Sequence, residues 1–221
     1  TESYALFAMD DDGQQTGDYS VHLQRTNNPG NATTISYGQT VEDTIRRAEM
    51  GAYRFTGSVN DVITIRMAAS WGGGPQIELY DPVGTLLYSI GPIPGWQSWA
   101  RIDTFALPSS GSYTILARDN DGQETGTYNI HVQKTNPPVG AAMLSFGQTR
   151  QDTLTQWTQI KAYTFSGTAN DVVTVQMSSS TVQTWLELYR QNGTLLRRFN
   201  NRIDTLTLPG TETYALFAMD D

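Results

Sequence analysis

Short segments in which apolar and polar residues alternate run along most of the chain. In TYNIHVQK, Tyr128, Ile130 and Val132 share one face and the polar residues between them share the other, as in a half-buried strand. The stretches AYRFTG, DVITIRM, QIELYD, IDTFALP and YTILAR follow the same pattern and are bounded by Gly, Pro, Asn and Asp. The pattern predicts an all-β protein. One stretch, TVEDTIRRAEMG before Ala52, has the length and charge for one or two helical turns.

Several long stretches of the sequence occur twice in the chain, which indicates a repeat architecture. SYALFAMDDDGQQTGDYSVHLQRTNNP aligns with SYTILARDNDGQETGTYNIHVQKTNPP, so that Tyr4 matches Tyr113. AYRFTGSVNDVITIRM likewise matches AYTFSGTANDVVTVQM, IELYDPVGTLL matches LELYRQNGTLL, and RIDTFALP matches RIDTLTLP. The opening TESYALFAMDD recurs at the end as TETYALFAMDD, with Ser3 replaced by Thr213. The chain therefore holds two copies of one unit and the start of a third.

Pro-rich stretches set the expected domain boundaries, because proline favours extended spacers. RTNNPGNATT and KTNPPVGAA place linkers at 28–34 and 136–142. A complete unit is expected at 35–135, and a second unit, lacking its last hairpin, at 143–221. Residues 1–27 have the sequence of that hairpin. We expect each unit to be an antiparallel, jelly-roll-like β-sandwich, and the chain to be a tandem of them.

A two-stranded hairpin is marginal in water, so we expect both ends of the chain to be completed by neighbours. Either the chain is a slice of a longer tandem array, or separate subunits exchange strands. Repetition of such a contact without closure gives a filament.

Composition argues against a nucleic-acid partner, a membrane span and a disulfide framework. The formal net charge is −8, which argues against nucleic acid, whose phosphates attract Lys and Arg. No apolar run approaches the length of a membrane span. Without cysteine, each unit depends on a hydrophobic core in place of disulfides.

The order AYRFTGSVNDVITIRM, IELYDPVGTLL and IDTFALPSSGSYTILARDNDGQETGTYNIHVQ resembles the bacterial pre-peptidase C-terminal (PPC) domain family. The resemblance covers one whole unit and the visible part of the other. It implies a secreted, jelly-roll-like sandwich that is appended to peptidases and surface proteins, often in tandem, with some relatives binding calcium or polysaccharide. The second copy has LYRQNGT where the first has LYDPVGT, so any role of Asp81 does not extend to it.

Two acidic loops, MDDDGQQTGDY and RDNDGQETGTY, are candidate calcium sites. Calcium prefers oxygen ligands, and Asp10 with Asp12, or Asp119 with Asp121, precedes a glycine as in the opening of a calcium loop. The Glu that closes an EF-hand loop is missing, and the same residues suit a tight β-turn. Both interpretations remain open.

Asn31 in NAT and Asn192 in NGT are candidate N-glycosylation sites. Asn31 lies in an expected linker, where Thr and Ser could also carry O-linked sugar. Asn192 with Gly193 equally suits a type I′ hairpin turn.

Trp71, Trp96 and Trp99 fall in Gly- and Pro-rich stretches. Aromatic rings in loops can stack on sugars, and they can equally cover the end of a sheet. The only histidines, His22 and His131, occupy equivalent positions that face away from the expected core. We expect them to be surface residues.

The sequence contains no catalytic signature such as HExxH, G-x-S-x-G or a phosphate loop, so we expect no enzyme. The first hypothesis is an extracellular or cell-surface structural repeat protein that forms a fibre or stalk. Its partners would be copies of itself or adjacent repeats, with glycans and calcium as further candidates. The alternative is a carbohydrate- or matrix-binding accessory module of a secreted hydrolase.

Overall fold

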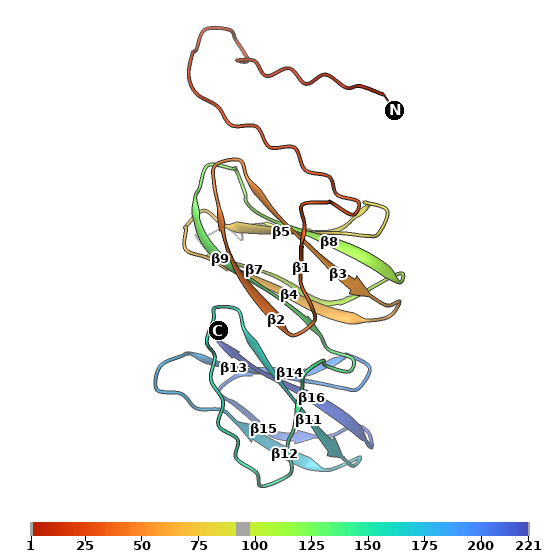
Figure 1. Ribbon diagram of the computed structural model, residues 1–221. Helices are drawn as coiled ribbons and strands as arrows, with labels where there is room; N and C mark the ends of the chain where they lie inside the picture. Colours follow the sequence, from red (N-terminus) through yellow and green to blue (C-terminus); the bar gives the residue numbers. More distant parts are fainter. Residues whose placement is uncertain (1, 92–97, 221) are drawn as a thin grey trace.

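A computed structural model describes residues 2–91 and 98–220 of the chain. All regular elements of the described part are β-strands, and they form two sandwiches that lie one below the other (Figure 1). Residues 2–32 run in an extended, strand-free path above the first sandwich. The described residues include no helix long and apolar enough to cross a membrane.

The first sandwich consists of a five-stranded and a four-stranded sheet, as the alternating pattern predicts. The five-stranded sheet contains, in spatial order, β1 (Thr33–Thr34), β3 (Met50–Gly57), β8 (Gly111–Asp119), β5 (Pro75–Tyr80) and β6 (Leu86–Ile90). The four-stranded sheet contains β2 (Gln39–Ile45), β9 (Gly126–Lys134), β4 (Val62–Ala69) and β7 (Trp99–Ala106).

The suggested helical turns before Ala52 are wrong, because the first half of that stretch lies in β2 and its last two residues lie in β3. Strand β2 pairs antiparallel with β9 from Gln39↔Val132 to Ile45↔Gly126. Tertiary pairing with β9 outweighs the local helical tendency of a charged segment.

The side chains between these two sheets form one continuous core. The inward residues of β9, Tyr128, Ile130 and Val132, are fully buried in it. They are the residues that the alternating pattern placed on the apolar face, so the core side of this strand is confirmed.

The second sandwich reproduces the first five-stranded sheet but not the other sheet. Its five strands are, in spatial order, β10 (Ala142–Met143), β11 (Ile160–Gly167), β16 (Glu212–Asp220), β13 (Thr184–Tyr189) and β14 (Leu195–Asn200). Opposite them, the described residues provide only β12 (Val172–Gln176) and β15 (Arg202–Thr207).

Residues 148–154 correspond to β2 by sequence, yet they form no strand. Among residues 2–91 and 98–220, none forms the counterpart of β9, which would lie between 148–154 and β12. A segment without a partner for its backbone amides cannot form a ladder. Residues 148–154 therefore form no strand, although they resemble β2 in sequence.

The turn at Asn192 differs from the type I′ expectation. Gly193 has a φ of 86°, but Asn192 is not among the residues with positive φ, whereas a type I′ turn needs both. The Gly193 amide donates to the Arg190 carbonyl, and the ladder shifts register between Leu188 and Tyr189. The connection is thus a longer turn closed by a bulge.

Candidate functional site

The missing strand leaves a groove in the second sandwich. The groove has a volume of about 780 Å³ and runs between residues 144–154 and β12. Its lining combines core residues with backbone edges and includes Phe146, Tyr163, Phe165, Val175, Met177 and Leu216. In the first sandwich, β9 fills the corresponding place between β2 and β4.

The chain carries one segment with the sequence of the missing strand, at residues 17–25. Its three apolar residues Tyr19, Val21 and Leu23 are 74, 57 and 92% exposed. Their counterparts in β9 are fully buried. The segment therefore exposes apolar side chains to water. Burying them in the groove would contribute about 1.5–3 kcal/mol for each side chain to the stability of the complex.

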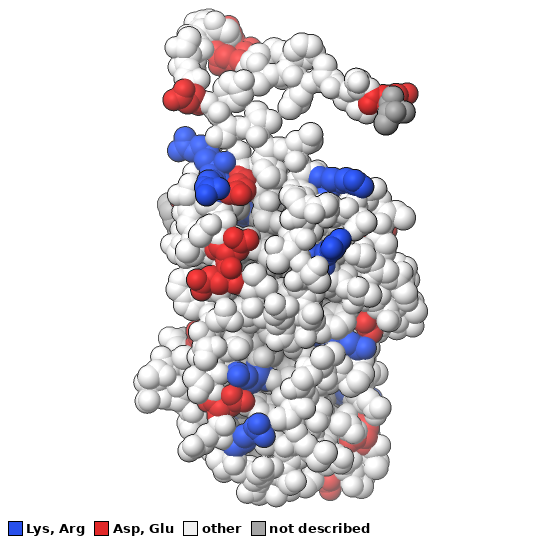
Figure 2. Space-filling view, viewed as in Figure 1, with Lys and Arg blue, Asp and Glu red and all other residues white. Residues whose placement is uncertain are grey.

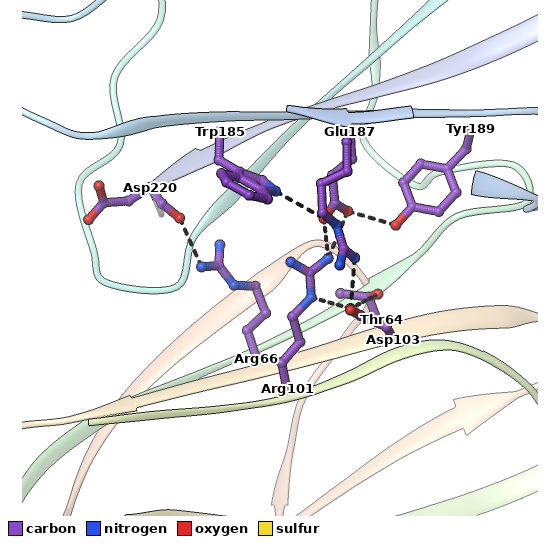
Figure 3. A network of polar contacts seen from close by, with 9 residues as sticks. Thr64, Arg66, Arg101, Asp103, Trp185, Glu187, Tyr189 and Asp220 are labelled. Carbon is purple, nitrogen blue, oxygen red and sulfur yellow. Dashed lines mark hydrogen bonds and ion pairs between the residues drawn. The ribbon is translucent and has the colours of Figure 1, made fainter. Parts of the chain in front are cut away.

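A polar junction joins the two sandwiches. It lies between the four-stranded sheet of the first and the five-stranded sheet of the second (Figure 3). Arg101 on β7 donates from one nitrogen to both Glu187 oxygens, at 2.6 and 2.7 Å. Arg198 on β14 donates to Glu187 at 2.7 Å and to Asp103 at 2.8 Å. The Arg66 guanidinium donates to the Asp220 carbonyl at 2.8 Å.

The Glu187 carboxylate is the centre of this network. Its side chain is 1% exposed, and it also accepts hydrogen bonds from Tyr189 at 2.6 Å and from Trp185 at 3.3 Å. Burial by itself would raise the pKa of Glu187, but Arg101, the Tyr189 hydroxyl and Arg198 outweigh it and hold the pKa below its ordinary value. The carboxylate therefore stays charged and paired.

Sequence reasoning did not find this junction. It names neither Arg101 nor Glu187, because outward polar residues of a strand are indistinguishable from solvated ones when the neighbouring sandwich is unknown. The available signal is recurrence, since ELY at 78–80 returns at 187–189 and RID at 101–103 returns at 202–204.

The expectation that His131 is a surface residue is wrong, because the second sandwich covers its sheet. His131 is fully buried and its Nδ1 lies 2.8 Å from the Thr40 hydroxyl oxygen. Burial, together with the charge of Arg66, lowers the pKa of His131 to about 3. His22 remains partly exposed, 3.3 Å from Gln24.

The four candidate calcium ligands are engaged by backbone amides. Asp10 accepts from the Gln15 amide and Asp12 from the Gln14 amide. Asp119 accepts from Gln123 and Glu124, and Asp121 accepts from Gln123. These contacts are those of closed turns, although one oxygen of the buried Asp119 has no partner.

Calcium at these loops stays a prediction. Within residues 2–91 and 98–220, no cluster of three or more His, Cys, Asp or Glu residues is arranged to hold a metal ion.

Both sequons lie on the surface. Asn31 is exposed and its side chain exchanges two hydrogen bonds with Gln24, at 3.0 and 3.1 Å. Asn192 is exposed in its turn and accepts from the Thr194 amide at 3.0 Å. Glycosylation of either residue stays a prediction.

Two of the three candidate tryptophans lie within the described residues, and they differ in exposure. Trp71 is 5% exposed and packs edge-on against Tyr128 in the core. Trp99 is 44% exposed on β7, and Trp96 lies outside the described residues. Because sugar stacking needs an open ring face, the carbohydrate hypothesis depends on Trp99 among the described tryptophans of this set.

Charged side chains of both signs are scattered over the face shown in Figure 2, where Lys and Arg do not gather into one patch. Asp and Glu side chains mark the extended N-terminal segment. The largest concentration of ion pairs in the described residues is the junction at Glu187.

No family model and no curated protein matches this chain. Among solved structures, the pre-peptidase C-terminal domain of a Bacillus anthracis collagenase is 20% identical, covers 48% of this chain and 99% of its own, and gives a TM-score of 0.38. The surface-associated copper-binding protein CorA of Methylomicrobium album BG8 is 10% identical, with coverages of 47% and 96% and a TM-score of 0.34. The periplasmic lysozyme inhibitor PliG of Aeromonas hydrophila is 12% identical, with coverages of 47% and 96% and a TM-score of 0.31.

Proposed function

We propose that this chain is a non-enzymatic, extracellular structural protein whose copies join end to end. In each joint, residues 17–25 of one copy occupy the groove of another copy's second sandwich. They would lie between 148–154 and β12 and complete a four-stranded sheet like that of the first sandwich. Repetition of this joint builds a fibre.

The observation that carries the proposal is the match between one open groove and one unused strand. The internal alignment also predicts the register. Because Met67 pairs with Ile130, Met177 is expected opposite Val21. Because Gln39 pairs with Val132, Gln148 is expected opposite Leu23. Backbone bonds on both sides of an inserted strand supply affinity, and alternate apolar side chains supply register.

The non-enzymatic part of the proposal is supported by the sequence, which carries no catalytic signature. The extracellular part is supported by the resemblance of the strand and turn motifs to secreted PPC domains. Neither calcium nor glycan is needed for the joint.

The test is Val21→Asp in the full chain. Val21 is 57% exposed, so the change leaves the fold of the separate chain intact. In the joint, it would place a carboxylate in an apolar core, which is strongly unfavourable. We expect the unmodified chain to form filaments in electron micrographs and high-mass species in sedimentation, and the variant to remain monomeric.

Leu6→Asp is the matched control. Leu6 is also exposed, at 75%, and lies in the same extended segment. Its counterpart Leu216 is already present in β16 of the second sandwich, so the joint does not need it. Monomers of the unmodified chain, or equal assembly of both variants, would contradict the proposal.

A further inference from the structure

The junction at Glu187 has an unoccupied counterpart at each end of the molecule. On its first-sandwich side the junction uses Thr64, Arg101 and Asp103, together with Arg66, whose counterpart in the second sandwich is the uncharged Gln176. The internal alignment places Thr174, Arg202 and Asp204 at the same positions of the second sandwich, and we call these three residues the Arg202 face. The Thr64 and Thr174 hydroxyls lie 3.4 Å from the Asp103 and Asp204 carboxylates, respectively.

The two sets differ in what covers them. The side chains of Arg101 and Asp103 are 12 and 31% exposed under the second sandwich. Those of Arg202 and Asp204 are 51 and 53% exposed, although their guanidinium and carboxylate also pair, at 2.8 Å. The Arg202 face therefore has the arrangement of a junction with no partner on it.

The other side of the junction also recurs. Glu187 and Tyr189 on β13 correspond to Glu78 and Tyr80 on β5, and the tyrosine donates to the glutamate in both, at 2.6 and 2.7 Å. Arg118 donates to Glu78 at 3.0 Å. We call Glu78, Tyr80 and Arg118 the Glu78 face.

Glu78 has one guanidinium partner where Glu187 has two. Arg198 from the same sandwich and Arg101 from the adjoining one both bind Glu187. Within the described residues, Arg118 from its own sandwich binds Glu78. The Glu78 side chain is 13% exposed, and among the described residues no second guanidinium binds it as Arg101 binds Glu187.

The hairpin turns beside the two glutamates repeat the same close approach. A Cβ on Gly193 would lie 3.0 Å from Thr135 Oγ1, at the linker that joins the sandwiches. A Cβ on Gly84, the counterpart of Gly193, would lie 3.1 Å from Thr26 Oγ1. Thr26 is the counterpart of Thr135 and follows the segment that fills the groove in the proposed joint. Half of a second junction is thus already in place on the first sandwich.

We propose that the Arg202 face of one copy docks on the Glu78 face of a second copy and repeats the internal junction, with the Arg202 guanidinium on the Glu78 carboxylate. This inference rests on the proposed joining of copies and adds a second surface to it. Strand insertion alone joins two copies through the segment that follows residue 25. Face docking fixes the angle between them, so that every sandwich meets the next in the same way along the fibre.

Arg202→Glu in the full chain tests the docking. We expect it to raise the dissociation constant for assembly by at least about 30-fold, because it places two carboxylates together in a covered contact. Arg47→Glu is the control. It makes the same change of charge at an exposed residue outside both faces. Arg202→Glu with Glu78→Arg in one chain exchanges the two charges and should recover most of the lost affinity.

Hydrogen exchange at 17–25 separates the two levels of the proposal. Protection there with weakened assembly of Arg202→Glu supports the docking. Protection there with equal assembly of Arg202→Glu and Arg47→Glu overturns the docking and leaves strand insertion standing. Absence of protection in the unmodified chain overturns both.

Discussion

His131 is buried in its neutral form beside Arg66, and its protonation therefore opposes folding. Its pKa is lowered from 6.5 to about 3, so the unfolded chain binds the proton more readily. Stability from this residue is complete above about pH 6.5 and is lost progressively as the pH falls toward 3. The loss is about 1.4 kcal/mol for each pH unit in that window.

His131→Gln should remove this part of the pH dependence. We expect urea unfolding of the unmodified chain to give about 2 kcal/mol less free energy of unfolding at pH 5 than at pH 6.5, with a flatter profile for the variant. His22→Gln, at the equivalent but partly exposed position, is the control. An unchanged slope in His131→Gln would show that another group is responsible.

At the scale of elements, one sequence motif takes two structures. SYGQTVEDTI contains β2, whereas SFGQTRQDTL forms no strand. The difference is the presence of β9 beside the first motif and of the open groove beside the second. Strand formation here depends on a partner rather than on intrinsic propensity.

Amide hydrogen exchange should report this dependence directly. In dilute solution we expect residues 148–154 to exchange rapidly while residues 39–45 stay protected by their ladder to β9. Protection reflects the free energy of local opening, and 148–154 gains it when a strand enters the groove. Equal protection of the two segments in the monomer would contradict the assignment of the groove as open.

The sequence predicts most strands well, because most strand motifs occur once in each of the two units and can be compared. The internal alignment also finds that residues 17–25 repeat the sequence of β9, the strand without a counterpart in the described part of the second sandwich. The sequence does not predict β2, whose charged residues look helical, nor the burial of Trp71 and His131, which neighbouring elements cover. The expected type I′ turn at Gly193 is not formed. The backbone angles there depend on a bulge in the β13–β14 ladder, and the identities of Asn192 and Gly193 do not reveal that bulge.

At the scale of the whole molecule, Glu187 links the stability of the two sandwiches. Glu187→Ala would leave the Arg101 and Arg198 guanidiniums without their shared carboxylate, and breaking a buried pair in this way costs about 3 kcal/mol. We expect a lower melting temperature in calorimetry and two separate transitions, because the sandwiches no longer stabilise each other.

Glu212→Ala is the matched control for this change. Glu212 pairs with Arg190 at 2.7 Å, outside the junction, and the Arg190 and Glu212 side chains are 36 and 14% exposed. Because this pair is more exposed than the junction at Glu187, we expect its loss to cost less, on the order of 1 kcal/mol. If the two variants melt alike, the junction contributes no special stability.

The position of β9 determines how the chain responds to tension. This strand lies between β2 and β4, antiparallel to both, and the chain leaves its last residue, Lys134, for the linker to the second sandwich. Gln39, where β2 begins, pairs with Val132 near the end of β9, so the chain enters and leaves this ladder at the same end. We therefore expect tension along the chain to open the β2–β9 hydrogen bonds one after another, like a zipper. In a protein without cysteine, no disulfide stops that opening, and a fibre of such units would yield under load and extend.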